Sequence, residues 1–371
     1  MDGGGRHGGL DGLRGIAALS IVVLHCWLYT TTTDEKHDSL WDGAIHQFRL
    51  GVVLFFCLSG YLLYRGWVAA AAGDRPEPAL AAYARSRTVR ILPAYLLALA
   101  GTLAILGPQA GAVRGLDVPG PEHWWLFLVF GSNLSRATAG ALDPPMWTLA
   151  VEVQFYLLLP LLGLAAVRLG RAGRFGALVP AVLAIAVGVA FDAWAMGRPG
   201  DVVILDSLPV ALPAFGCGML VAVLLHRRPV GRAAGWAALL AGAALVVADG
   251  WWHETGSGTA GLLWRDLPAC AGFALLVAAI LGGRARWLAA RPLVGLGAVS
   301  FGLYLWHMPV ILALRGAGIF PEGEPLLSTL AVLAVSLPLA WASWRLVEQP
   351  LLERAAAPRA FAACTGSARP G

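Results

Sequence analysis

The stretch that decides the fold class runs from Leu10 to Tyr29 and reads LDGLRGIAALSIVVLHCWLY. It is mostly apolar and long enough to cross a bilayer as a helix. Arg14 and His25 lie in it, and eleven residues of helix amount to three turns plus about 20°, or about 16 Å along the axis. Both side chains therefore project from the same side of the helix. Ionisable groups inside a span are costly unless they face polar surroundings, so the pair predicts a polar path partway through the membrane.

The composition agrees with a membrane protein. Hydrophobic residues make up 58% of the chain and charged residues 13%, whereas soluble domains have about 45–50% and about 25%. The charged residues cluster between long apolar runs, which is typical of a polytopic helical membrane protein. The cysteines have no paired spacing, so we expect neither a disulfide framework nor a metal site. We therefore predict an all-α bundle in the cell membrane that crosses the lipid bilayer many times.

The apolar runs predict about ten transmembrane helices. A further apolar piece at 122–134 is too short to cross, and we interpret it as interfacial or re-entrant because of its Trp124–Trp125 pair. We expect a mobile N-terminus at 1–9, a membrane domain at 10–350 and a disordered tail at 351–371. The predicted spans are 10–29, 49–70, 91–107, 146–166, 175–195, 203–225, 234–250, 260–283, 293–314 and 326–346.

The distribution of positive charge predicts the orientation. With the N-terminus in the cytoplasm, twenty arginines fall on the inner side, and seven of the 27 Lys and Arg residues fall on the outer side. This asymmetry matches the rule that cytoplasmic loops are basic, so both termini are predicted to be cytoplasmic. The net charge of +5 is then mostly a topology signal and gives no reason to expect a nucleic-acid partner.

Two groups of basic residues are candidates for chemistry: Arg14 with His25, which lies near the outer end of the first span, and an arginine group at the inner side. A neutral His25 in an apolar environment is able to accept a proton, and Asp11 lies three residues before Arg14 on the same face. The alternative is a histidine bonded to a backbone carbonyl, with Arg14 reaching toward the headgroups. Arg85, Arg87 and Arg90 suit phosphate groups, but taken alone they fit topology and lipid headgroups better.

Three later segments place polar groups inside predicted spans. Glu152 lies about 7.5 Å below the boundary residue Trp147, at a depth similar to that of His25, and needs a partner there. On the ninth span Ser300, Tyr304 and His307 follow at i, i+4 and i+7 and form one stripe, which suggests a cavity lining. Two further motifs fit packing and a structural role better, namely Ser59-Gly60 and Glu348-Gln-Pro350.

Six motifs in this order resemble the acyltransferase 3 family of integral membrane acyltransferases, from about Leu10 to Leu351. They are LDGLRG at 10–15 with His25 eleven residues after Arg14, FFxLSG at 55–60, RxxR at 87–90, WTLxVExxFY at 147–156, SxxxYLxHxP at 300–309 and ExP at 348–350. The resemblance implies transfer of an acyl group, usually acetyl, from cytoplasmic acyl-CoA to hydroxyls of carbohydrates or of glycosylated or macrolide small molecules. It also implies an essential Arg14–His25 pair and inner arginines at Arg87 and Arg90. Val53 stands where some relatives have Asp, which leaves the subfamily open.

These residues suggest roles in a common mechanism. We expect the acyl-CoA phosphates on Arg85, Arg87 and Arg90, and His25 as general base on the acceptor hydroxyl or as transient acyl carrier. Glu152 or His307 would orient His25. The substrate pocket is assigned to Trp147, Tyr304 and Ser59, and no metal is expected.

Two other functions fit a polar stripe less well. A proton- or anion-coupled secondary transporter would show internal repeats and paired broken helices, which the sequence lacks. A non-catalytic scaffold would not need polar groups at matched depth in three spans.

Overall fold

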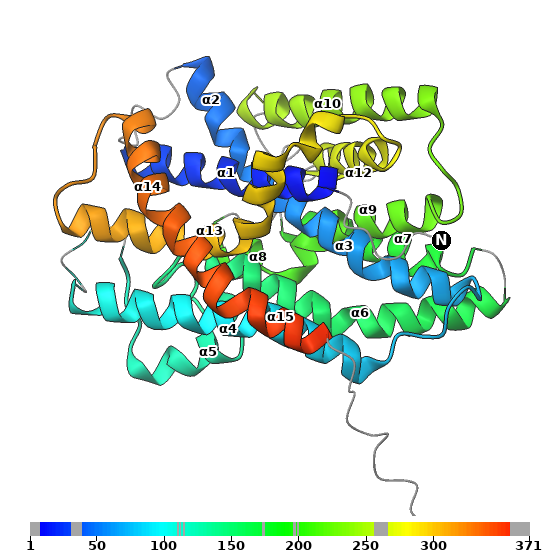
Figure 1. The fold of residues 1–371 in the computed structure, drawn as a ribbon, viewed down its shortest axis with the longest axis horizontal. Coiled ribbons are helices and arrows are strands. Elements are labelled where there is room, and N and C mark those ends of the chain that lie inside the picture. The colour runs from blue at the N-terminus through cyan, green and yellow to red at the C-terminus, as the bar shows by residue number, and fades with distance from the viewer. Residues whose placement is uncertain are drawn as a thin grey trace, which may run out of the picture.

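The computed structural model describes residues 8–30, 39–109, 111, 113, 116–172, 175–195, 198, 200–255 and 266–356. Within these ranges every regular element is a helix, as predicted. Figure 1 shows the long helices packed into one bundle. The expected mobile N-terminus and disordered tail fall largely outside the described residues.

The long helices are α1 (Gly8–Thr30), α3 (Leu50–Ala71), α4 (Leu80–Leu106), α6 (Met146–Ala172), α7 (Leu178–Ala195), α9 (Leu208–Leu224), α10 (Arg232–Thr255), α13 (Arg291–Gly316) and α14 (Pro325–Ser343). The shorter helices are α2 (Leu40–His46), α5 (Trp124–Leu128), α8 (Val202–Leu205), α12 (Leu267–Leu281) and α15 (Gln349–Ala356). Short 3-10 turns, η1 (Gln47–Arg49) and η4 (Ser132–Leu134), and a π-helical turn, η6 (Trp344–Glu348), connect some of them.

Nine helices of the described chain are long and apolar enough to cross a membrane. Nine of the ten predicted spans correspond to them. The remaining one, predicted at 260–283, corresponds to α12, whose described part is shorter and equally apolar. The interfacial piece at 122–134 contains only the five-residue helix α5, which agrees with a segment that does not cross. The protein is therefore a multi-pass helical membrane protein.

Glycines allow the central helices to approach each other closely. A Cβ on Gly297 of α13 would overlap the Asp11 carbonyl of α1, and one on Gly15 would come within 2.9 Å of the Leu293 carbonyl oxygen. Small residues at such crossings are what helix packing in lipid favours, because backbones then meet over a wide contact. The α1–α13 contact positions His25 of α1 against His307 of α13.

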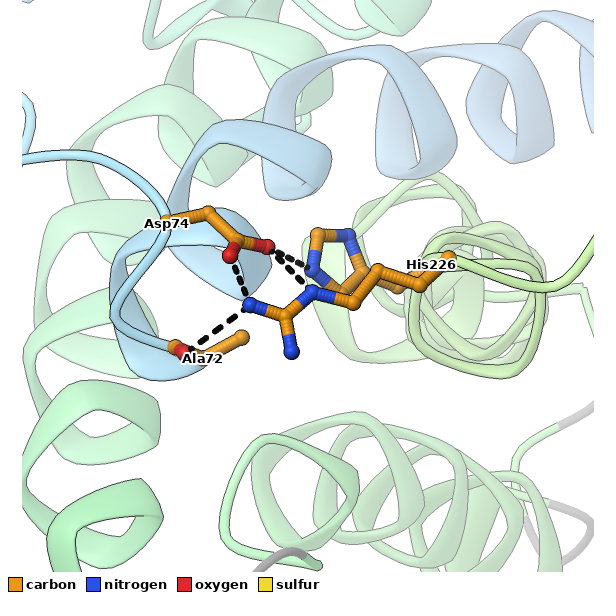
Figure 2. Close-up of polar contacts among 4 residues, drawn as sticks. Ala72, Asp74 and His226 are labelled. Atoms are coloured by element: carbon orange, nitrogen blue, oxygen red, sulfur yellow. Dashed lines mark hydrogen bonds and ion pairs between the residues drawn. The ribbon is translucent and has the colours of Figure 1, made fainter.

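A carboxylate joins the ends of α3 and α9. Asp74 follows α3, and His226 and Arg227 follow α9. The Asp74 carboxylate accepts from Arg227 Nε at 2.8 Å and contacts His226 Nε2 at 2.7 Å (Figure 2). A second guanidinium nitrogen of Arg227 pairs with the other carboxylate oxygen. This cluster links the segments that follow α3 and α9.

Candidate functional site

A cavity of about 350 Å³ opens near the arginine-rich end of the bundle, and we call it the arginine cavity. Helices α1, α3, α4, α6 and α13 form its wall. Four arginines face two carboxylates around it, so its lining is basic. The polar lining residues are Asp11, Arg14, Ser59, Arg65, Arg87, Arg90, Glu152, Thr148, Tyr156, Ser300 and Tyr304.

Glu152 is held inside the arginine cavity by two hydroxyl groups. Ser59 on α3 donates to Glu152 Oε1 at 2.7 Å, and Tyr156, one turn further along α6, donates to the same oxygen at 2.6 Å. The buried Nε of Arg14 has no hydrogen-bond partner in the described part of the chain. An unpaired guanidinium N–H in a basic cavity suits an anionic ligand, because burial without a partner is costly.

A second cavity, of about 320 Å³, contains the ring of His25, and we call it the histidine cavity. It lies between α1, α3, α6 and the starts of α9 and α12. Its lining differs in chemistry from that of the arginine cavity, because one arginine faces two aspartates. The polar lining residues are His25, Arg49, Trp147, Thr148, Asp206, Ser207, Asp266, Cys270 and Tyr304.

The two histidines make one direct contact, His25 Nδ1 to His307 Nε2 at 2.9 Å. His307 Nδ1 lies 2.7 Å from the Tyr304 carbonyl oxygen and 3.2 Å from that of Leu303. A carbonyl oxygen only accepts, so His307 Nδ1 carries the hydrogen and, in the uncharged pair, His307 Nε2 is the acceptor. His25 Nδ1 is then the donor, and the lone pair of His25 Nε2 is available to take a proton.

The two cavities share a wall made of Val52, Phe56, Thr148 and Tyr304, which line both. The hydroxyls of Thr148 and Tyr304 lie 2.7 Å apart, and Tyr304 donates to the Pro145 carbonyl oxygen at 3.0 Å. We call this wall the partition. The sequence predicts one polar path from Arg14 to His25. In the structure Arg14 lines the arginine cavity and His25 lines the histidine cavity, and the two cavities adjoin at the partition.

The structure brings most of the sequence-predicted residues to the two cavities. Glu152 lies with Arg14 in the arginine cavity and accepts hydrogen bonds from Ser59 and Tyr156, whereas His25 lines the other cavity. Of the two suggested orienting residues, His307 makes the contact. Arg85 is exposed and absent from the lining of both cavities. Trp147 lines the histidine cavity.

Sequence reasoning missed four charged lining residues. Arg65 follows Leu58 by seven residues on the same face of α3, a spacing that could have revealed it. Arg49, Asp206 and Asp266 resemble ordinary charged residues at span ends and give no such signal. In the described ranges, no group of three or more His, Cys, Asp or Glu side chains could hold a metal ion.

The fold and the two cavities define a polytopic membrane protein with a polar centre. The acyltransferase 3 family model, described as an acyltransferase domain, matches residues 7–345, and the chain belongs to this family. No solved structure matches the chain. The protein is therefore a membrane acyltransferase that transfers groups other than aminoacyl groups.

Curated relatives cover most of the chain at low identity. Nodulation protein 10 of Rhizobium leguminosarum bv. viciae is 27% identical, over 94% of this chain and 94% of its own. The putative membrane-bound transacylase BcsY of Komagataeibacter xylinus is 25% identical over 94% of this chain and 83% of its own. The putative peptidoglycan O-acetyltransferase YrhL of Bacillus subtilis is 26% identical over 92% of this chain, but the match spans only 54% of that relative.

Proposed function

We propose that the protein transfers an acyl group, in the simplest case acetyl, from acyl-CoA to a hydroxyl group of a carbohydrate or glycosylated acceptor. The observation that supports this most is the pair of cavities of different chemistry that meet at the partition. The Bacillus relative is named as a putative peptidoglycan O-acetyltransferase, and this name supports a hydroxyl group of a glycan as acceptor.

The donor is assigned to the arginine cavity. Coenzyme A carries phosphate groups, and guanidinium groups bind phosphate through charge-assisted, bidentate hydrogen bonds. Arg65, Arg87 and Arg90 supply these groups, while Arg85, which points elsewhere, is left out of the site. Arg14 lies deeper on α1 and has a free Nε–H, so it is placed to contact the donor near its reactive end.

His25 is assigned the role of general base in the histidine cavity. Its Nε2 takes the proton of the acceptor hydroxyl as the hydroxyl oxygen attacks the thioester carbon, and the carbon–sulfur bond then breaks. The leaving thiolate takes this proton from His25, so free coenzyme A departs and His25 returns to its neutral form. His307 accepts from His25 Nδ1 and thereby fixes its tautomer, as the third group of a triad does.

The partition separates the assigned donor site from His25, so the thioester has to pass it. The Tyr304 ring moves aside when its bonds to Thr148 and Pro145 are broken, and this joins the two cavities. A two-step route, in which His25 first takes the acyl group and then passes it to the acceptor, uses the same residues. Both routes require His25 and an open partition.

The test is acyl transfer by purified protein in liposomes, with acetyl-CoA labelled in the acetyl group and a panel of glycans. We expect label on at least one glycan and a loss of about 100-fold or more in His25→Ala. His123→Ala is the matched control, because His123 lies outside both cavities and its variant should retain activity. Label on no acceptor, or equal transfer by His25→Ala, contradicts the proposed function.

A further inference from the structure

The partition has an apolar part that the proposed mechanism does not use. Of its residues, Thr148 and Tyr304 carry hydroxyl groups, whereas Val52 and Phe56 on α3 are apolar and line both cavities. We propose that Val52 and Phe56 limit the length of the acyl group, so that the protein accepts short acyl chains and rejects longer ones. The inference rests on the proposed function and adds to it the class of acyl donor.

The acyl group has to reach the partition from the side of the arginine cavity. The donor is assigned to that cavity and His25 lines the other, so the thioester carbon lies where the two cavities meet when transfer occurs. The rest of the acyl chain is apolar and packs against apolar side chains. Val52 and Phe56 are one helical turn apart on the same face of α3, and they supply that surface at the meeting point.

The Phe56 ring cannot retreat, because other aromatic rings pack around it. Phe56 is 5% exposed, and its ring centroid lies 4.8 Å from that of Phe215 and 6.3 Å from that of Trp147. Phe215 in turn stacks on Phe155 with centroids 3.8 Å apart, and both of these side chains are fully buried. Moving Phe56 would displace this row of rings, which a close-packed interior resists.

The backbones of α3 and α9 hold this row of rings in place. Gly60 lies one turn after Phe56, and a Cβ on it would overlap the Phe215 carbonyl oxygen. The missing side chain therefore lets α9 approach α3 and brings Phe215 onto Phe56. Tyr304 of the partition is held instead by hydrogen bonds of its hydroxyl group, which can break as the thioester passes. The partition therefore combines a movable residue on α13 with a rigid one on α3.

A rigid apolar wall discriminates between acyl groups by size. An acetyl group ends in a single methyl group, whereas each further methylene has to find space against Val52 and Phe56. One methylene changes the selectivity of an apolar pocket by about 10- to 200-fold. Forcing extra methylenes against a packed core is unfavourable, because the surrounding rings would have to leave their positions. Rejection of longer chains therefore follows from the fixed position of Phe56.

The test measures transfer from acetyl-, butanoyl- and hexanoyl-CoA by purified protein in liposomes. We expect kcat/KM of the wild type to fall by about tenfold or more from the acetyl to the butanoyl donor. Phe56→Val removes the ring and should raise the butanoyl-to-acetyl ratio by about tenfold or more. Val52→Leu adds volume at the same boundary and should lower that ratio.

A matched control separates loss of the ring from loss of core packing. Phe127 is buried but lines neither cavity, so Phe127→Val should keep the wild-type dependence on chain length. Phe56→Leu is the second variant if Phe56→Val does not fold, and it should shift the ratio in the same direction by a smaller factor. Equal ratios in the wild type and the Phe56 variants overturn the proposal, as does a wild type that prefers the longer donors.

Binding gives a second measurement that needs no transfer. Coenzyme A thioethers with S-ethyl, S-butyl and S-hexyl groups resemble these donors and lack the thioester. The wild type should bind the ethyl compound about tenfold or more tightly than the butyl compound, and Phe56→Val should narrow that difference. Binding of none of the thioethers, or the same ratio in both proteins, overturns the proposal. Transfer to no acceptor contradicts the proposed function, while these affinities still decide whether Val52 and Phe56 limit the chain.

Discussion

His307 directs one ring nitrogen at carbonyl oxygens of its own helix and the other at His25. Removing it should leave the His25 tautomer unspecified. We predict that His307→Ala lowers kcat by about 100-fold or more and leaves the KM for acetyl-CoA nearly unchanged. His307→Gln, which returns an acceptor oxygen near the lost Nε2, should recover part of the rate. Unchanged kcat in His307→Ala would show that His25 needs no orienting partner.

Substitutions of the three arginines near the start of α4 should differ in their effect on donor binding. Arg87→Ala and Arg90→Ala each remove a charge-assisted bond, so we predict that each raises the KM for acetyl-CoA by about 10- to 100-fold. We expect little change in kcat at saturating donor. Arg85→Ala is the matched control because Arg85 is exposed outside both cavities. An equal effect of all three would indicate long-range attraction instead of a built phosphate site.

Asp143 precedes α6 and is 2% exposed. Both its carboxylate oxygens lack a hydrogen-bond partner among the described residues. Burial raises the pKa of Asp143 well above its usual value of about 3.8. The folded protein therefore keeps this proton at pH values where the unfolded chain has lost it, and the free energy of unfolding falls as pH rises between the unfolded and folded pKa values.

Asp143→Asn removes this dependence. Between the unfolded and folded pKa values, the free energy of unfolding of the variant should exceed that of the wild type by about 1.4 kcal/mol more for each pH unit. The gain should stop growing once the pH passes the folded pKa. Thermal unfolding in detergent at pH 5, 6 and 7 measures it. Parallel pH profiles for the two proteins would mean that Asp143 is already ionised in the folded state.

At the scale of helices, the α1–α13 contact sets the distance between the two histidines. Gly297→Ala forces a methyl group into the Asp11 carbonyl, and we predict a loss of about 1–3 kcal/mol in the free energy of unfolding together with lower kcat. Gly295→Ala, on the same helix with nothing within 4 Å of the new methyl, is the matched control. It should be neutral or slightly stabilising. Equal destabilisation by both would argue against close packing at Gly297.

Periodicity predicted the helices because a span needs a long apolar run, and such runs are visible in sequence. It also predicted that Arg14 and His25 share a stripe of one helix. The partition was not predictable in this way, since Tyr304, Thr148 and Phe56 come from three helices whose packing no single-helix pattern encodes. The choice of His307 over Glu152 as partner of His25 likewise depends on the α1–α13 crossing. Asp206 and Asp266 look like ordinary outer-loop acids until folding brings them to one cavity.

At the scale of the whole molecule, the number of crossings decides where the chain ends lie. The described residues contain nine helices long enough to cross, and α12 has 15 residues, which is about 22 Å of helix against a hydrocarbon core of about 30 Å. If α12 and the residues before it complete a tenth crossing, both termini lie on one side. If they do not, the termini lie on opposite sides. The charge distribution favours ten crossings with both ends in the cytoplasm.

Reporter fusions test whether the chain crosses the membrane an even or an odd number of times. A green fluorescent protein fused after Gly371 should fluoresce, and an alkaline phosphatase fused there should be inactive, because that end is predicted to be cytoplasmic. Fusions after Arg228 should behave in the same way, and fusions after Gly200 should give the opposite pair of signals. These two sites lie before α12, so they calibrate the orientation independently of it. Phosphatase activity at Gly371 with cytoplasmic signals at Arg228 would mean that α12 does not cross. It would also contradict the predicted orientation of α13, because that helix, with His307, would then cross the membrane in the direction opposite to α1.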